Sequence, residues 1–205
     1  MALLNYSLPM ISYINGTVRA VIGKTVTVEV RGIGYRVTIP EKNLKSIAKI
    51  GAAVKLYTHY SINPRDGTVG LYGFATPEEL NFFELLTTIS GIGPKSAQAI
   101  LSAADLQQLQ LGIFRGDDGY LTKVAGIGPK TAARLVLELK NKIMAVAVDA
   151  KTGGEMGAEE EAIEALTTLG YSQYQARDAI KAVNTKAAST EEKIKEALRF
   201  LGGKK

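Results

Sequence analysis

One motif occurs twice in this chain, at a fixed distance. Residues 89–97 read Ile-Ser-Gly-Ile-Gly-Pro-Lys-Ser-Ala, and residues 124–132 read Val-Ala-Gly-Ile-Gly-Pro-Lys-Thr-Ala. The offset of 35 residues also aligns Leu86 with Leu121 and Ile100 with Leu135. Because the offset persists beyond the motif itself, the pattern indicates an internal structural repeat, and we expect two copies of one local fold.

Each copy predicts two helices joined by a tight turn. An apolar residue ends the first helix, a Gly-Ile-Gly turn follows, and proline suits the first position of the second helix. Glycine permits positive φ and leaves no Cβ between backbone and ligand, so the amides of the turn and of the next helix can face one anion. The lysines add charge and the hydroxyl residues add donors. The candidate phosphate-binding residues are Gly91, Gly93, Lys95, Ser96, Gly126, Gly128, Lys130 and Thr131.

This arrangement resembles the helix-hairpin-helix motif of DNA-binding proteins, which holds a phosphate without reading a base. Two such hairpins at fixed spacing resemble the paired unit that holds both strands across a minor groove. Ile92 and Ile127 are expected to point back between the helices and keep each turn rigid. The alternative is a pair of Gly-Pro turns that link helices in an ordinary bundle.

Two enzyme classes are disfavoured by the same residues. Gly-Pro-Lys-Ser and Gly-Pro-Lys-Thr look like the end of a nucleotide-binding P-loop, but no glycine stands five residues ahead of a Gly-Lys pair and no β-rich run leads in. Helix-hairpin-helix glycosylases place a catalytic Asp soon after the second hairpin, whereas here the next acid is Glu138. We therefore expect neither an ATP site nor a catalytic site.

Composition narrows the remaining classes. The chain has 205 residues, no cysteine and one histidine, His59, which disfavours disulfides, zinc sites and histidine-based triads, and predicts no metal and no cofactor. Its longest apolar run, residues 143–148, is too short to span a bilayer. Residues 1–9 carry no basic segment typical of a secretory signal. A cytoplasmic protein without a membrane partner is expected.

The net charge of +5 is unevenly distributed. Residues 1–75 hold nine Lys and Arg against three Asp and Glu, whereas residues 76–145 hold seven of each kind and residues 146–205 hold nine against ten. A basic amino-terminal region beside a phosphate-binding repeat suggests that both contact nucleic acid.

The amino-terminal region reads as a small barrel after an extension, residues 1–9, that we expect to be poorly ordered. From residue 10 to residue 75 the apolar pattern has period two, with five candidate strands at 12–21, 25–31, 35–39, 54–62 and 68–72. A short helical stretch near residues 41–47 follows the third strand. Five strands with this helix are the order of an OB-fold barrel, and an SH3-like or other small barrel is the alternative.

The rest of the chain reads as helical. Thr76, Pro77 and Glu79 form a helix start, and residues 76–145 hold both hairpins. Residues 146–157 are small and glycine-rich and predict a flexible linker. Residues 158–205 contain three short amphipathic patterns, which predict a loosely tethered three-helix, UBA-like module suited to binding a protein.

In combination these features resemble the RuvA family of Holliday junction branch migration proteins, over residues 10–201. Besides the hairpins, the likeness lies in Gly32-Ile-Gly-Tyr35, Leu71-Tyr-Gly-Phe74 and Leu169-Gly-Tyr171. The fold class is therefore α+β and multidomain, with an OB-fold barrel, a tandem helix-hairpin-helix domain, a flexible linker and a carboxy-terminal module.

The resemblance implies a non-catalytic, structure-specific DNA-binding subunit that holds open a four-way junction in recombination and DNA repair. It implies a homotetramer, one or two per junction, in which the hairpin residues hold minor-groove backbones. It also implies that the carboxy-terminal module recruits the hexameric RuvB ATPase, with Leu166, Leu169 and Tyr171 as the contact, and that the RuvC resolvase is a further partner. The rival classes are a general duplex-binding adaptor and a hairpin-containing repair enzyme.

One turn departs from the family pattern. The family has two adjacent acids between the last two strands, forming an acidic pin at the junction centre that repels phosphates. Here the turn reads Asn63-Pro64-Arg65-Asp66-Gly67 and offers a single carboxylate beside an arginine. The hypothesis is that Asp66 keeps part of the role of the pin while Arg65 offsets some of its field.

Overall fold

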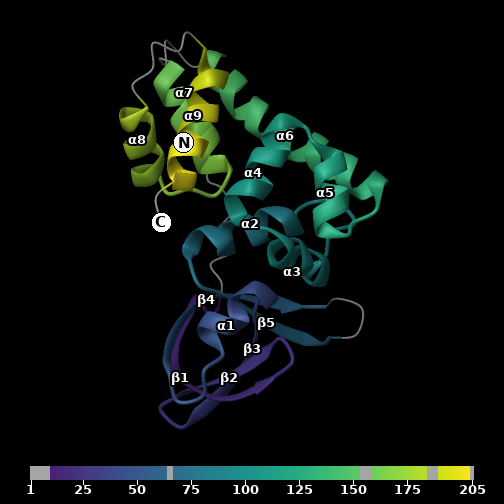
Figure 1. The fold of residues 1–205 in the computed structure, drawn as a ribbon, viewed down its shortest axis with the longest axis vertical. Coiled ribbons are helices and arrows are strands. Elements are labelled where there is room, and N and C mark those ends of the chain that lie inside the picture. The colour runs from purple at the N-terminus through teal and green to yellow at the C-terminus, as the bar shows by residue number, and fades with distance from the viewer. Residues whose placement is uncertain (1–9, 64–66, 153–157, 184–188, 204–205) are drawn as a thin grey trace. The chain divides into compact units, whose positions relative to one another are not determined.

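The chain folds into two compact units, Met1–Leu80 and Asn81–Lys205. The computed structural model describes residues 10–63, 67–152, 158–183 and 189–203, so the predicted extension at residues 1–9 lies outside the described residues (Figure 1). The first unit is mainly a β-barrel and the second is helical. The predicted fold class is confirmed: a five-stranded barrel precedes a helix-hairpin-helix region and a carboxy-terminal helical module.

The barrel is closed in the strand order β1-β2-β3-β5-β4. The first three strands form an antiparallel meander, β4 and β5 form an antiparallel hairpin, and a parallel pairing of Thr38 with Tyr72 joins β3 to β5. The predicted helical stretch lies between the third and fourth strands, as in an OB-fold. The elements are β1 (Tyr13–Ile22), β2 (Thr25–Val30), β3 (Ile33–Thr38), η1 (Glu41–Asn43), α1 (Leu44–Ile47), β4 (Ala53–Ile62) and β5 (Val69–Phe74).

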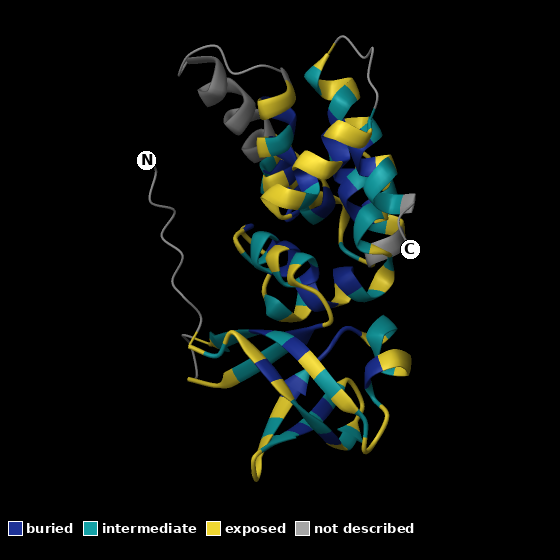
Figure 2. Cartoon of the chain, turned by 90° about the vertical axis from the view of Figure 1, so that its left-hand side faces the viewer, coloured by how far each residue is buried: buried dark blue, intermediate teal, exposed yellow. Residues whose placement is uncertain are grey.

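The period-two pattern of the sequence sets the barrel core. Alternate strand residues point inward and are buried, while their neighbours face outward, as the alternating colours of the strands show (Figure 2). The buried cluster consists of Ile14, Val26, Val28, Val37, Ile39, Ile47 and Leu56. His59 is half-buried on the strand β4, where it pairs with Tyr72 of β5.

Glycines explain two of the short stretches that carry the family resemblance. In the Leu71–Phe74 stretch, a Cβ added to Gly73 would lie 2.4 Å from Cγ1 of Val37, so only glycine fits at this point of the barrel wall. In the turn between β2 and β3, Arg31 and Gly32 both have positive φ, 49° and 87°, as a two-residue type I′ hairpin requires.

The predicted start of the helix α2 (Pro77–Thr87) is present, with a variation. The amide of Glu79 donates to Oγ1 of Thr76 at 3.3 Å, but the Glu79 carboxylate accepts from the amide of Ala75 at 3.2 Å, one residue before the expected partner. That carboxylate is buried and is also bound by Lys42 at 3.2 Å and by Asn43 at 3.0 Å. These contacts attach the first turn of the helix to η1 of the barrel.

The second unit contains the helices of both hairpins and of the carboxy-terminal module. The helix α6 continues to Thr152, so the linker predicted for residues 146–157 is helical over its first seven residues and lies outside the described residues from 153 onward. Alanine has the highest helix propensity, and no glycine occurs in this segment before Gly153. The helices are α3 (Pro94–Ala103), α4 (Leu106–Arg115), α5 (Asp118–Ala125), α6 (Pro129–Thr152), α7 (Ala158–Thr168), α8 (Gln173–Ala182) and α9 (Thr190–Gly203).

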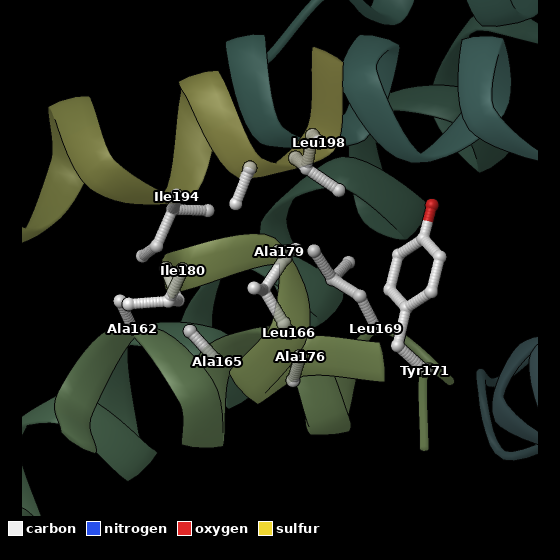
Figure 3. Close-up of a cluster of buried hydrophobic side chains, with 11 residues drawn as sticks. Ala162, Ala165, Leu166, Leu169, Tyr171, Ala176, Ala179, Ile180, Ile194 and Leu198 are labelled. Carbon is white, nitrogen blue, oxygen red and sulfur yellow. The ribbon is translucent and has the colours of Figure 1, made fainter. Parts of the chain in front are cut away.

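The three carboxy-terminal helices enclose a small apolar core of their own (Figure 3). Leu111 and Phe114 of the helix α4 pack against this core, so the module is docked on the helix-hairpin-helix region. A loose tether was predicted instead. The charge and glycine content of the sequence did not indicate this docking, because the residues of α4 that make the contact are apolar.

Candidate nucleic-acid interface

The first hairpin joins α2 to α3 through a turn that is anchored by buried residues. The amide of Ile89 donates to the carbonyl of Leu86 at 3.1 Å, and the amide of Ile92 donates to that of Ile89 at 3.0 Å. Both isoleucine side chains are buried, as predicted for Ile92. The turn is therefore anchored by its apolar residues, which leaves its glycines at the surface.

The glycines of this first turn face open space. Gly91 has φ +90°, and neither Gly91 nor Gly93 has any atom within 4 Å of the position that a Cβ would take. Lys95 is exposed and Ser96 is half-exposed in the first turn of α3. The first helical hydrogen bond runs from the amide of Ala97 to the carbonyl of Gly93 at 2.9 Å, so the amides of residues 95 and 96 have no helical acceptor.

The second hairpin repeats this geometry between α5 and α6. Gly126 caps α5 in the left-handed conformation with φ 62°, and Gly126 and Gly128 again have open space at the Cβ position. The amide of Ala132 donates to the carbonyl of Gly128 at 2.9 Å, the equivalent of the bond in the first hairpin. Lys130 is exposed and Thr131 half-exposed.

The repeat extends into the core behind the turns. Residues that are 35 positions apart are buried in both copies, namely Leu86 with Leu121, Ala97 with Ala132, and Ile100 with Leu135. One difference is that Ile92 is buried whereas Ile127 is only half-buried. The second turn is thus less firmly anchored than the first.

The two hairpins meet at a shallow pocket of about 170 Å³. The turn of the first hairpin supplies Ser90 and Gly91, and the start of α6 supplies Lys130, Thr131 and Arg134. No carboxylate lines this pocket, and both cations are exposed. Residues from both copies of the sequence repeat therefore line one pocket, with hydroxyl groups and positive charge around it.

This surface has the chemistry of a phosphate-binding site. Free amides at a helix start point at an anion and carry the positive end of the helix dipole, and a nearby lysine adds a full charge. Such contacts position a nucleic-acid backbone and read no base. The structure places all eight predicted hairpin residues at the two turns and helix starts, and their binding of DNA stays a prediction.

Two residues of the pocket, Ser90 and Arg134, were not among the candidates selected from the sequence. Ser90 lies inside the repeated motif but aligns with an alanine, Ala125, so the repeat gave no reason to select it. From the sequence alone, Arg134 suits either an additional phosphate contact or a solvated position, and its place in the pocket favours the first role. Its spacing of four residues from Lys130 was the available signal, because such residues share one face of a helix.

The turn expected to act as an acidic pin is described only at its ends. Asp66 and Arg65 lie outside the described residues. The amide of Asn63 donates to the carbonyl of Thr68 at 2.8 Å, and the amide of Gly67 donates to that of Asn63 at 2.9 Å. The ladder of β4 with β5 continues up to Ile62 and Val69, so the turn tops a regular hairpin.

The residues predicted to contact the motor lie in the module core. Leu166 and Leu169 are fully buried and Tyr171 is 6% exposed, at the edge of the apolar cluster (Figure 3). The Tyr171 hydroxyl donates to Oε1 of Gln110 at 2.7 Å, and Nε2 of Gln110 donates to the carbonyl of Leu169 at 2.7 Å. In this arrangement these side chains support the docked module, and a direct contact with a partner stays a prediction.

Two other kinds of site are not seen in the described part of the chain. No group of three or more His, Cys, Asp or Glu side chains is placed to hold a metal ion there. Among the same residues, none of the helices combines the length and apolar character needed to cross a membrane.

Comparison with known proteins covers nearly the whole chain. Residues 10–73 match the family model "RuvA N terminal domain", residues 83–141 match "SAM-like Helix-hairpin-helix tandem", and residues 157–202 match "RuvA, C-terminal domain". A protein of Herpetosiphon aurantiacus is 41% identical over 95% of this chain and its own full length. Proteins of Ruminiclostridium cellulolyticum (37% identical, 94% of this chain, 100% of that protein) and Acetivibrio thermocellus (38%, 94%, 98%) are also similar. All three are named Holliday junction branch migration complex subunit RuvA.

Proposed function

The chain belongs to the RuvA family, and on this premise we propose that it binds four-way DNA junctions and serves as the junction-binding subunit of a branch migration complex. The observation that carries the proposal is the pair of equivalent hairpins that meet at one basic pocket. Two phosphate-binding turns side by side suit the two strands of one duplex arm. The chain itself is proposed to have no enzymatic activity.

The assembly that we propose is a homotetramer, with one or two tetramers on each junction. A four-way junction has four equivalent arms, so four copies of one paired-hairpin surface match its symmetry. The barrel hairpin that ends in Asp66 is proposed to lie at the junction centre. There its carboxylate repels backbone phosphates, and Arg65 offsets part of that repulsion.

The energy for branch migration is proposed to come from the hexameric ATPase RuvB, bound by the carboxy-terminal module, with RuvC as a second partner. Leu166, Leu169 and Tyr171 would act by shaping the module, because their side chains are buried. Tyr174 of the helix α8 is 81% exposed and lies three residues from Tyr171, which makes it the better candidate for direct contact. Partners that act on chromosomal DNA imply a cytoplasmic location.

The experiment that tests the proposal compares two DNA substrates at near-physiological salt. The purified chain is titrated with a synthetic four-way junction and with a linear duplex that carries the sequence of one arm. We expect the junction to bind at least tenfold more tightly, a difference of about 1.4 kcal/mol. Equal affinities would instead support a general duplex-binding adaptor.

A second measurement addresses the acidic turn. Asp66→Asn removes the single carboxylate of this turn, and Asp105→Asn, at the exposed residue that precedes α4, serves as the matched loss of one negative charge. We expect Asp66→Asn to slow branch migration in the presence of RuvB and ATP while Asp105→Asn does not. If Asp66→Asn leaves both junction opening and branch migration unchanged, the role proposed for Asp66 is wrong.

A further inference from the structure

A second basic pocket lies away from the hairpin turns, between the helix-hairpin-helix region and the carboxy-terminal module. Its volume is about 380 Å³, within the range of small-ligand sites. The helix α4 contributes Phe114 and Arg115, α6 contributes Lys140, and α9 contributes Glu191, Lys195 and Arg199. Four cations and one carboxylate thus converge from three helices.

The three residues of α9 show how the sequence builds one wall of this pocket. Glu191, Lys195 and Arg199 are spaced four apart and therefore lie along one face of the helix. An adjoining side of the same helix supplies Ile194, Ala197 and Leu198 to the module core. Docking of the module on α4 then brings this face opposite Arg115 and Lys140.

The charges in the pocket are poorly compensated. Arg199 forms an ion pair with Glu196, and Glu191 lines the pocket itself. Within the described residues, the side chains of Arg115, Lys140 and Lys195 form no hydrogen bond or ion pair. Positive charges held together without enough acids repel one another, and a bound anion would relieve that repulsion.

A structural role explains only part of the cluster. The ammonium of Lys140 lies 3.7 Å from the Cβ position of Gly116, the residue that caps α4, so Lys140 and Arg115 can balance the negative end of that helix dipole. Lys195 and Arg199 belong to another helix and have no such function at this helix end. The pocket thus has more positive charge than the helix terminus requires.

We propose that this pocket binds an anion with several phosphate groups and thereby holds the carboxy-terminal module against the helix-hairpin-helix region. Arginine and lysine on opposite walls suit phosphate oxygens, to which guanidinium groups can donate two parallel hydrogen bonds. The phosphates come either from a small polyphosphate compound or from consecutive phosphodiesters of a DNA backbone. Phe114 is the one apolar residue among the described residues that line the pocket.

The test uses the full chain with two pairs of substitutions. The pocket variant, Arg115→Gln with Lys195→Gln, removes one cation from each wall. The control variant, Arg177→Gln with Lys181→Gln, makes the same change of charge at exposed positions of α8. Both are also made in a chain carrying Lys95→Gln and Lys130→Gln, so that anion binding at the hairpins does not obscure the result.

Inorganic tripolyphosphate and a short blunt duplex are the two probes. If the ligand is a small polyphosphate, calorimetry will show tripolyphosphate binding that is at least tenfold weaker in the pocket variant than in the control. If it is DNA, the pocket variant will flatten the salt dependence of duplex binding by about 0.9 per lost phosphate contact while the control does not. Identical behaviour of the two variants with both probes would overturn the proposal.

Discussion

Gly91 and Gly93 lie two residues apart in the first hairpin, but their backbones have φ angles of opposite sign. Gly91 has φ +90°, whereas Gly93 is the extended N-cap of α3 with φ −90°. Serine at residue 91 is strained by about 1–2 kcal/mol, while serine at residue 93 is a favourable N-cap. We expect Gly91→Ser to lower the free energy of unfolding and Gly93→Ser to leave it unchanged or raise it, as measured by urea denaturation.

The same two substitutions separate an effect on folding stability from an effect on DNA binding. A Cβ at either position enters the open space in front of the turn, where we propose that a phosphate lies. Junction affinity is therefore expected to fall in both variants, including the stable Gly93→Ser protein. A Gly93→Ser chain that binds junctions as tightly as the unaltered chain would contradict close approach of the backbone to this turn.

Single residues were predictable where local chemistry decides their role. Glycine at positive φ and proline at a helix start follow from short-range sterics and occur in both hairpins, whereas the expected burial of the central isoleucine is complete only for Ile92. Leu169 and Tyr171 show the opposite case. Their apolar spacing indicates that they are buried. It does not distinguish burial by the module's own helices and Gln110 from burial by a partner.

At the scale of elements, the strands and the short helix of the barrel were predictable because each buried face repeats with period two. The end of α6 was not. Small residues after Met144 suit a linker, but alanine also favours helix, and local composition does not decide between these states. The contact of α4 with the module was also not predictable, because glutamine and leucine in a helical pattern do not indicate which element they will contact.

The contact between α4 and the module depends on a closed pair of hydrogen bonds. Gln110 is fully buried, accepts from the Tyr171 hydroxyl and donates to the carbonyl of Leu169. Tyr171→Phe or Gln110→Leu alone leaves a buried polar group without its partner, at a cost of about 1–3 kcal/mol. Combining the two changes should cost less than their sum, because the hydroxyl and the amide that bond each other are both removed.

This coupling can be measured by hydrogen exchange of the module helices in the four proteins of a double-mutant cycle. Faster exchange in α8 and α9 is expected for each single variant, since the docked state also protects the module. Gln107→Ala is a useful comparison, because Gln107 also joins α4 to the module but donates to the carbonyl of Leu201 at 2.7 Å. Strictly additive effects of the two changes would mean that Gln110 and Tyr171 are not coupled.

At the scale of the whole molecule, positive charge is concentrated at particular surfaces, although the net charge of the helical regions is near zero. Residues 76–145 hold equal numbers of acids and bases, yet among the described residues the only charged ones that line the pocket between the hairpins are the cations Lys130 and Arg134. A count over the sequence averages over faces that the fold separates. For the same reason, the cluster of Arg115, Lys140 and Lys195 appears only once the helices are packed.

Lys95 and Lys130 should contribute equally to DNA binding, because they occupy equivalent positions in the two hairpins. Each phosphate neutralised by a cation releases counterions, so the logarithm of affinity falls with the logarithm of salt concentration by about 0.9 per contact. Lys95→Gln and Lys130→Gln are each expected to flatten this slope by about that amount for each bound subunit, and the double variant by about twice as much. Lys181→Gln, at an exposed site on α8, is the control that should leave the slope unchanged. If Lys130→Gln accounts for the whole change, only the second hairpin holds a phosphate, and the unequal burial of Ile92 and Ile127 becomes the structural difference to examine.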